Sequence, residues 1–168
     1  MRWGLIPFWA TDLKKLPVMI NAMSETAATK PAFRAAFKRR RCLVLADGYY
    51  EWQKAGKIRL PWYYTLKDDG AFAFAGLWER WEHGDKPVES CTILTTDAND
   101  LAAQVHDRMP VILNAKARKL WLDPDVEPDA LQEILKPFPE TGLATRRVGT
   151  QVNKAGVEGP ECVAPCEA

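Results

Sequence analysis

The sequence predicts a single α+β domain over 1–168, built on a curved, mostly antiparallel and open barrel-like sheet with several short helices. The length of 168 residues is typical of one domain. Short apolar runs bounded by turn residues, such as CLVLA and CTILTT, are typical of strands. Short helical segments separate these runs, and we find no internal repeat and no low-complexity segment. Many short strands with a few helices between them favour the α+β class.

The first elements are predicted in the N-terminal quarter of the chain. PVMI (17–20) is strand-like, and Ser24 is expected to cap a short helix over 24–28. Pro31 suits the first turn of a second helix, PAFRAAFKRR, over 31–40.

The second predicted helix has two faces. Phe33 and Phe37 are one turn apart and are expected to face inward, whereas Lys30, Arg34 and Lys38 share another face. The pattern predicts a basic stripe over an aromatic anchor, although such a stripe is most often only a solvated face.

Strands dominate the middle of the chain. CLVLA is expected to be a short buried strand, Asp47 and Gly48 a turn, and YYEW the start of the next strand. LPWYYTL and AFAFAGLWERW are predicted to form a hairpin, joined by the turn residues Asp68, Asp69 and Gly70.

The remaining elements are expected from helix caps and apolar runs. CTILTT is a strand, Asp97 is expected to cap the short helix DANDLAAQV, and PVIL returns to the sheet as a strand. Asn114 is expected to cap AKARKLWL, and Pro128 to open PDALQEIL. RRVGTQV closes with a strand, and 153–168 is expected to be an irregular tail.

Charge is balanced overall but segregated along the chain. The 23 basic and 22 acidic residues give a net charge of +1, so any site for a polyanion must be local. Basic residues cluster in 30–41 and 146–147, and acidic residues in 123–140.

Signals for export or membrane insertion are not evident. The longest apolar runs fall far short of the ~20 residues that span a bilayer, so we expect a cytoplasmic protein with no membrane contact. Cys42, Cys91, Cys162 and Cys166 are expected to be free thiols in that compartment. The two histidines are remote in sequence from the C-terminal cysteine pair, so we expect no metal and no other cofactor.

Glu51 lies between Tyr50 and Trp52. Strand alternation places the two aromatic side chains on one face and Glu51 on the other. A strand carboxylate usually faces solvent, but one recessed among aromatics has a raised pKa, which suits general acid–base work near neutral pH. His106, in QVHDRMP, is expected at a junction between helix and strand; by itself it favours a local structural role, with Asp107 fixing its ring.

Aromatic residues near the N-terminus add a second possibility. Trp3 and Trp9 flank GLIPF, and exposed aromatics beside a basic groove can bind single-stranded nucleic acid by stacking and phosphate neutralisation. Spacing alone makes such a site possible and no more, and Asn21 alone is typical of a turn residue.

Several separated motifs resemble one known family. RWGLIPFWA, INAMSETAATKPAFRAAFKRRRCLVLADGYYEW, FAFAGLWERW, CTILTTDAND with HDRMPVIL, and VGTQVN are similar, in order and spacing, to motifs of the SOS response-associated peptidase (SRAP) family. The resemblance spans nearly the whole chain. It implies an SRAP-like fold, binding of single-stranded DNA, capture of abasic sites as a covalent DNA–protein crosslink in the SOS response to DNA damage, and self-release of a leader peptide where one is present.

The resemblance also assigns roles. The family's asparagine falls on Asn21, its catalytic glutamate on Glu51 and its histidine on His106. Glu51 would move protons as an abasic aldehyde forms an imine, His106 would assist ring opening or stabilise charge, and Asn21 would orient the family's N-terminal cysteine. The expected DNA contacts are made by Trp3, Trp9, Lys30, Arg34 and Arg108.

Two departures from the family pattern stand out. Met23 replaces the arginine usual two residues after the asparagine, and the chain begins MRWGLIP where the family begins Met-Cys-Gly-Arg. We therefore expect an N-terminally shortened SRAP domain without its nucleophile. Three hypotheses remain: the parent protein is a crosslinking enzyme, the chain is a non-covalent single-stranded DNA binder, or it is an inactive remnant.

Overall fold

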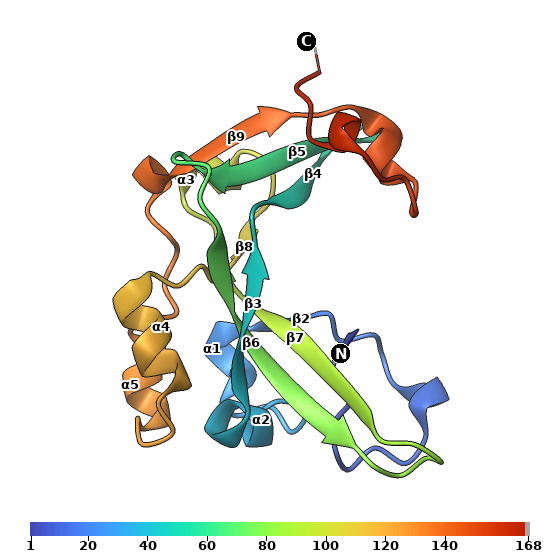
Figure 1. Ribbon diagram of the computed structural model, residues 1–168, viewed down its shortest axis with the longest axis vertical. Coiled ribbons are helices and arrows are strands. Elements are labelled where there is room, and N and C mark those ends of the chain that lie inside the picture. Colours follow the sequence, from blue (N-terminus) through green and yellow to red (C-terminus); the bar gives the residue numbers. More distant parts are fainter. Residues whose placement is uncertain (167–168) are drawn as a thin grey trace.

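Two β-sheets with short helices make up the computed structural model, which describes residues 1–166 (Figure 1). Sheet A has six strands: β1 (Arg2–Trp3), β2 (Asn21–Met23), β3 (Arg41–Ala46), β6 (Phe72–Trp81), β7 (Val88–Asp97) and β8 (Arg108–Pro110). Sheet B has three strands: β4 (Tyr49–Ala55), β5 (Ile58–Leu66) and β9 (Leu143–Arg147).

Strand pairing is mostly antiparallel. β1 and β2 run parallel to β7, and the pairs β3–β6, β6–β7, β7–β8, β4–β5 and β5–β9 are antiparallel. Together the sheets curl into a half barrel, with sheet B across one end of sheet A (Figure 1). The predicted α+β class with a curved, mostly antiparallel sheet is confirmed.

Short helices cover one face of sheet A. They are α1 (Ser24–Ala27), α2 (Arg34–Arg39), α4 (Ala115–Leu122) and α5 (Pro128–Gln132); a further helix, α3 (Asp100–Ala103), lies near sheet B (Figure 1). Phe37 of α2 and Trp121 of α4 are fully buried in the core cluster that also holds Leu77 and Leu94 of sheet A. Alternation along β6 and β7 then turns their other side chains to the opposite face, where the candidate site lies.

The predicted hairpin between the strands now labelled β5 and β6 is wrong. The turn residues are present, with Asp69 at a φ of +52°, but β5 pairs with β4 and β9, and β6 pairs with β3 and β7. Aromatic packing selects the β4–β5 pairing: the Tyr49 and Tyr64 rings stack with centroids 4.9 Å apart, and the Tyr50 and Tyr63 rings lie at the same separation. The turn residues therefore led to the prediction of a hairpin between two strands that belong to different sheets.

Two of the expected helix caps are wrong. Ser24 is the first residue of α1, where Met23 occupies the cap without a side-chain bond. Asn99 caps α3 by accepting from the Ala102 amide, because Asp97 ends β7 and its carboxylate accepts from a guanidinium. The expected cap of α4 at Asn114 and the first position of α5 at Pro128 are confirmed.

Three predicted segments are displaced along the chain. The early strand is Asn21–Met23 rather than 17–20, and α2 begins at Arg34, after a turn that contains Pro31. The strand predicted over PVIL ends at Pro110, although Ile112 still forms an isolated bridge with Phe74.

The C-terminal segment packs on sheet B. After β9 the chain forms two 3-10 turns, Thr150–Asn153, where a strand was predicted, and Pro160–Cys162. The Tyr50 hydroxyl donates to the Cys162 carbonyl (3.1 Å), and the Arg146 side chain donates to the Val163 carbonyl (2.9 Å). The last part of the predicted tail, 167–168, lies outside the described residues.

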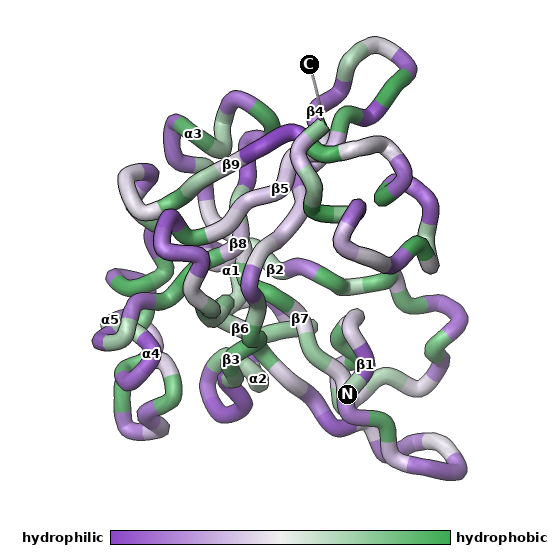
Figure 2. The backbone as a smooth tube through the Cα atoms, turned by 45° about the horizontal axis from the view of Figure 1, so that its top comes forward, coloured by the Kyte–Doolittle hydropathy of each residue, from purple (hydrophilic) through white to green (hydrophobic). Residues whose placement is uncertain are grey.

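Hydropathy follows this arrangement. Hydrophilic residues lie along β9 and at the tip of the β6–β7 hairpin, and hydrophobic residues lie along β6 where it crosses the middle of the molecule (Figure 2). None of the helices within residues 1–166 has the length and apolar character needed to cross a bilayer.

Candidate functional site

A cavity of about 330 Å³ lies between the two sheets. We call it the central cavity. Its walls come from the uncovered face of sheet A and from β4, one of the two outer strands of sheet B. The lining residues are Trp3, Asn21, Gly48, Tyr49, Tyr50, Glu51, Trp52, Phe74, Ile93, Thr95 and Pro110. The cavity therefore combines one carboxyl group and one amide with a mainly aromatic and apolar wall.

Strand register brings Asn21 to the cavity. β2 pairs in parallel with β7, which sets Asn21 opposite Ile93 and Met23 opposite Thr95. The Trp3 indole N–H donates to the Ile20 carbonyl (2.9 Å) and so fixes the tryptophan beside this strand. Met23, which is 46% exposed, shares the face of Asn21 on β2 but is not among the lining residues of the central cavity.

Glu51 is half-buried on β4. Burial raises the pKa of its carboxyl group above the ordinary value; a positive charge on His106 and the Trp52 backbone N–H act in the opposite direction, and the Asp107 charge raises the pKa further. The Tyr50 and Trp52 rings lie together, with centroids 6.1 Å apart, as strand alternation predicts. Glu51 is thus recessed, which is the condition under which the sequence predicted a raised pKa.

His106 lies at the margin of the central cavity and is not among its lining residues. It follows α3, and its Nδ1 lies 3.0 Å from the Arg108 backbone nitrogen, 3.3 Å from the Arg108 carbonyl oxygen and 3.2 Å from an Asp107 carboxylate oxygen, so these contacts fix the ring while fitting either tautomer. The Gln53 side chain donates to the Gln104 carbonyl (3.1 Å) and ties this segment to β4, two residues from Glu51. This bond holds the segment that carries His106 beside β4.

Arg108 is engaged by two carboxylates. Its guanidinium donates to both oxygens of Glu25 (3.0 and 2.9 Å), to Asp97 (2.6 Å) and to the Thr95 carbonyl (2.7 Å). The side chain lies on the same face as Thr95 and Pro110, because Asp97 pairs with Arg108 in the β7–β8 register. A phosphate at this position would have to compete with Glu25 and Asp97.

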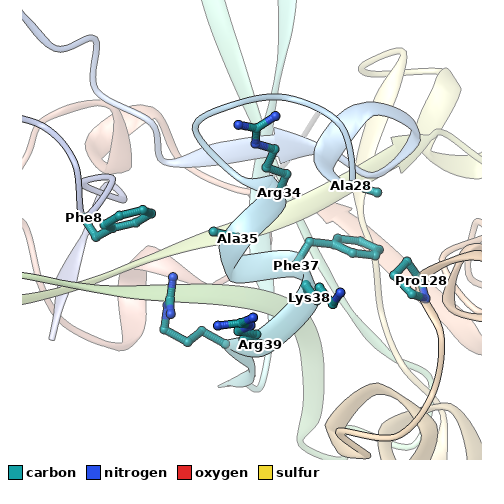
Figure 3. A pocket seen from close by; sticks show the side chains of 9 residues that line it. Phe8, Ala28, Arg34, Ala35, Phe37, Lys38, Arg39 and Pro128 are labelled. Carbon is teal, nitrogen blue, oxygen red and sulfur yellow. The ribbon is translucent and has the colours of Figure 1, made fainter.

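The basic stripe of α2 lies elsewhere. Arg34 and Lys38 line a separate cavity of about 530 Å³ on the helix-covered side of sheet A, together with Phe8 and Phe37 (Figure 3). Lys30 is exposed in the turn before α2. Exposed Trp9 lies near the same turn, where its indole N–H donates weakly to the Pro31 carbonyl (3.4 Å).

The structure therefore brings together Trp3, Asn21 and Glu51, with His106 and Arg108 at the margin. It does not bring the α2 stripe or Trp9 into the same cavity. Sequence reasoning missed the sheet A wall, namely Phe74, Ile93, Thr95 and Pro110. Alternation along β6 and β7 could have identified their common face, but only with the pairing of β2 and β8 already known.

The cysteines are remote from this chemistry. None of the four lines the central cavity. Burial and the neighbouring Cys91 raise the pKa of Cys42 to about 11, and burial also raises the pKa of Cys91. Both thiols are therefore poor nucleophiles near neutral pH. Among residues 1–166, no cluster of three or more histidine, cysteine or acidic side chains could hold a metal ion.

Comparison with known proteins gives one consistent result. A profile of the family "SOS response associated peptidase (SRAP)" matches residues 1–155. Abasic site processing protein YoqW of Bacillus subtilis (strain 168) is 42% identical over 166 residues, which cover 97% of this chain and 74% of that protein. Abasic site processing protein HMCES of Xenopus tropicalis is 35% identical over 190 residues, covering 98% of this chain and 56% of that protein.

A solved structure agrees with these sequence matches. A crystal structure of a protein from Bacteroides thetaiotaomicron superposes with a TM-score of 0.91 and 31% identity, covering 98% of this chain and 75% of that one. The fold, the order of the motifs and the matched length all agree. The chain belongs to the SRAP family.

Proposed function

We propose that this domain binds single-stranded DNA at an abasic site and takes part in the covalent capture of that site in the response to DNA damage. The observation that carries the proposal is the central cavity, where Glu51, with its raised pKa, shares an aromatic wall with Asn21. Relatives named abasic site processing proteins support this substrate class.

The chemistry suits a carboxyl group that retains its proton. When an amine adds to the aldehyde of a ring-opened abasic sugar, a carbon–nitrogen bond forms, and the aldehyde oxygen must gain protons and leave as water. Glu51 would donate a proton to that oxygen and accept one from the nitrogen. Its raised pKa increases the protonated fraction near neutral pH.

The neighbouring residues would assist this step. His106 would assist ring opening or stabilise charge at the sugar oxygen, and Asn21 would orient the attacking group. Trp3, Trp9, Lys30, Arg34 and Arg108 remain the proposed contacts to bases and phosphates. Release of a leader peptide, where one is present, would use the same acid–base group.

The cysteine thiols of the 168-residue chain are poorly suited to form a crosslink with DNA. Cys42 and Cys91 have raised pKa values and lie outside the central cavity, so neither fits the role of nucleophile. We therefore propose that this chain alone binds the strand without forming a durable crosslink. Non-covalent binding is accordingly the second candidate function, because no cysteine lines the central cavity.

Binding can be measured separately from chemistry. Fluorescence anisotropy would compare three ligands for the 168-residue chain: a single strand with one abasic site, the intact single strand, and the intact duplex. We expect both single strands to bind, with a preference for the abasic strand, and the duplex to bind more weakly. Equal affinity for all three ligands, or no binding at all, would contradict the proposal.

A further inference from the structure

A second surface adjoins the central cavity at Trp52. Besides the central cavity, Trp52 lines an open hollow of about 600 Å³ together with Lys57, Ile58, Arg59 and Asn153. We call this hollow the hairpin surface, because three of its residues lie at the tip of the β4–β5 hairpin. One indole side chain is thus the common wall of both hollows.

We propose that the nucleotides on one side of the abasic site leave the central cavity over Trp52 and bind the hairpin surface. The inference rests on the proposed function and adds a path for the strand. It commits the surface to single-stranded nucleic acid, whose bases can stack on Trp52 while its phosphates meet the cationic tip.

The orientation of Trp52 is fixed before any ligand binds. Its indole N–H donates to the Asn153 side-chain oxygen (2.7 Å), and the Asn153 amide donates in turn to the Arg59 carbonyl (3.0 Å). These two bonds tie the indole, the hairpin and the 3-10 turn Thr150–Asn153 into one unit. A ring held in this way loses little conformational freedom when a base stacks on it.

Charge at the hairpin tip is uncompensated. The stretch from Gln53 to Leu66 contains Lys54, Lys57 and Arg59 and no acidic residue. Within residues 1–166 none of these three side chains forms an ion pair. They differ in this respect from Arg108, whose charge is already matched by two carboxylates. Cations without protein partners release counterions when a phosphate binds, which favours binding at low salt.

The shape of the hairpin surface also suits a flexible strand. Lys57, Ile58 and Arg59 are all exposed, with Ile58 at 60%. An open surface with one rigid aromatic, one apolar side chain and two cations does not read base identity, and sites of this composition hold single strands without sequence preference.

The test uses the 168-residue chain and two single strands. Each strand has an abasic site at one end and about eight nucleotides beyond it, on the 3′ side in one strand and on the 5′ side in the other. Affinity is measured by fluorescence anisotropy over a salt series for the wild type and for Lys57→Ala/Arg59→Ala.

We expect the double variant to lose affinity for one of the two strands and to keep it for the other. At about 0.1 M salt the loss should be roughly tenfold, and the salt slope should fall by about 1.4, since each phosphate contact on a single strand accounts for about 0.7. The strand that loses affinity identifies the side of the lesion that lies on the hairpin.

The matched control is Lys116→Ala/Lys119→Ala on α4, which removes the same charge from exposed lysines that form no ion pair within residues 1–166. This control should bind both strands like the wild type. Trp52→Leu removes the ring and should weaken the same strand as the charge variant does.

Unchanged binding of both strands by Lys57→Ala/Arg59→Ala would overturn the inference and leave the surface to another partner, such as an acidic protein. An equal loss for both strands would also overturn it, because the effect would then come from overall charge. If the wild type binds neither strand, the proposed function itself fails, and that result is distinct from the other two.

Discussion

At the scale of single residues, the central feature is a carboxyl group placed where its charge is disfavoured. Glu51 is half-buried on an edge strand, and its pKa is raised chiefly by that burial. Protein stability therefore depends on the protonation of Glu51. A pKa that is higher in the folded state than in the unfolded state contributes stability below the unfolded value, and this contribution is lost as pH rises through the folded value.

The variant Glu51→Gln tests the direction in which the stability contribution of Glu51 changes with pH. It removes the charge and keeps the shape, so its melting temperature relative to the wild type should increase between pH 4 and pH 8. Thermal unfolding at several pH values measures the difference. The matched control is Glu158→Gln, an exposed carboxylate in the C-terminal segment, which should show no such trend. A difference that stays constant with pH would mean that the Glu51 carboxylate is not penalised in the folded protein.

At the scale of elements, the basic residues expected to contact DNA lie on different sides of sheet A. The α2 stripe borders its own cavity on the helix-covered side (Figure 3). Arg108 lies on the face of the central cavity. A strand that contacts both Arg34 and Arg108 would have to pass around the edge of the sheet. The two residues therefore need to be tested separately as well as together.

The double variant Arg34→Ala/Arg108→Ala is expected to lower the salt slope of single-strand binding by about 1.4, and each single variant by about half of that. Fluorescence anisotropy over a salt series measures the slope. If Arg34→Ala binds like the wild type while Arg108→Ala does not, the strand stays on the cavity side and α2 is only a solvated face. An unchanged slope in the double variant would remove both residues from the DNA site.

At the scale of the whole molecule, one core holds the helices against sheet A. Trp121 is fully buried, its ring meets Phe37 edge to face at 5.6 Å, and its indole N–H donates to the Cys42 carbonyl on β3 (2.9 Å). This side chain therefore links α4, α2 and the outer strand of sheet A.

Replacement of Trp121 by alanine should lower the free energy of unfolding by about 3–5 kcal/mol, because it removes a large buried ring and leaves an indole-sized cavity. Chemical denaturation measures the change. The neighbouring Leu122 is 49% exposed, and Leu122→Ala should alter stability by at most about 0.5 kcal/mol. Similar effects of the two substitutions would contradict the placement of α4 on the sheet.

The sequence predicted local features more accurately than it predicted which strands pair. The sequence correctly predicted that the Tyr50 and Trp52 rings lie together and that Asn114 caps α4. Both predictions depend on only a few neighbouring residues. Which strands pair depends on contacts far apart in the chain, so the turn at Asp69 wrongly suggested a hairpin. For the same reason the sequence could not place the α2 stripe on the far side of the sheet from the cavity.

The choice of helix cap also depends on tertiary contacts that the sequence alone does not reveal. Asp97 and Asn99 are both suitable caps two residues apart, and the ion pair between Asp97 and Arg108 decides between them. That ion pair joins β7 to β8 and is a tertiary contact. The hairpin surface was likewise not predicted, because the bond between Trp52 and Asn153 spans about a hundred residues of sequence.

Crosslinking to an abasic strand is the measurement that tests the proposed role of Glu51 most directly. The domain would be extended at its N-terminus by the family's Met-Cys-Gly-Arg segment, incubated with abasic single-stranded DNA, and followed over time on a denaturing gel. We expect a heat-stable shifted band, formed about 10²-fold more slowly by Glu51→Gln and at the wild-type rate by Glu158→Gln. The 168-residue chain by itself should give no heat-stable band, because none of its cysteines lines the central cavity. Equal rates for the extended wild type and its Glu51→Gln variant, or a heat-stable band from the 168-residue chain, would contradict the account.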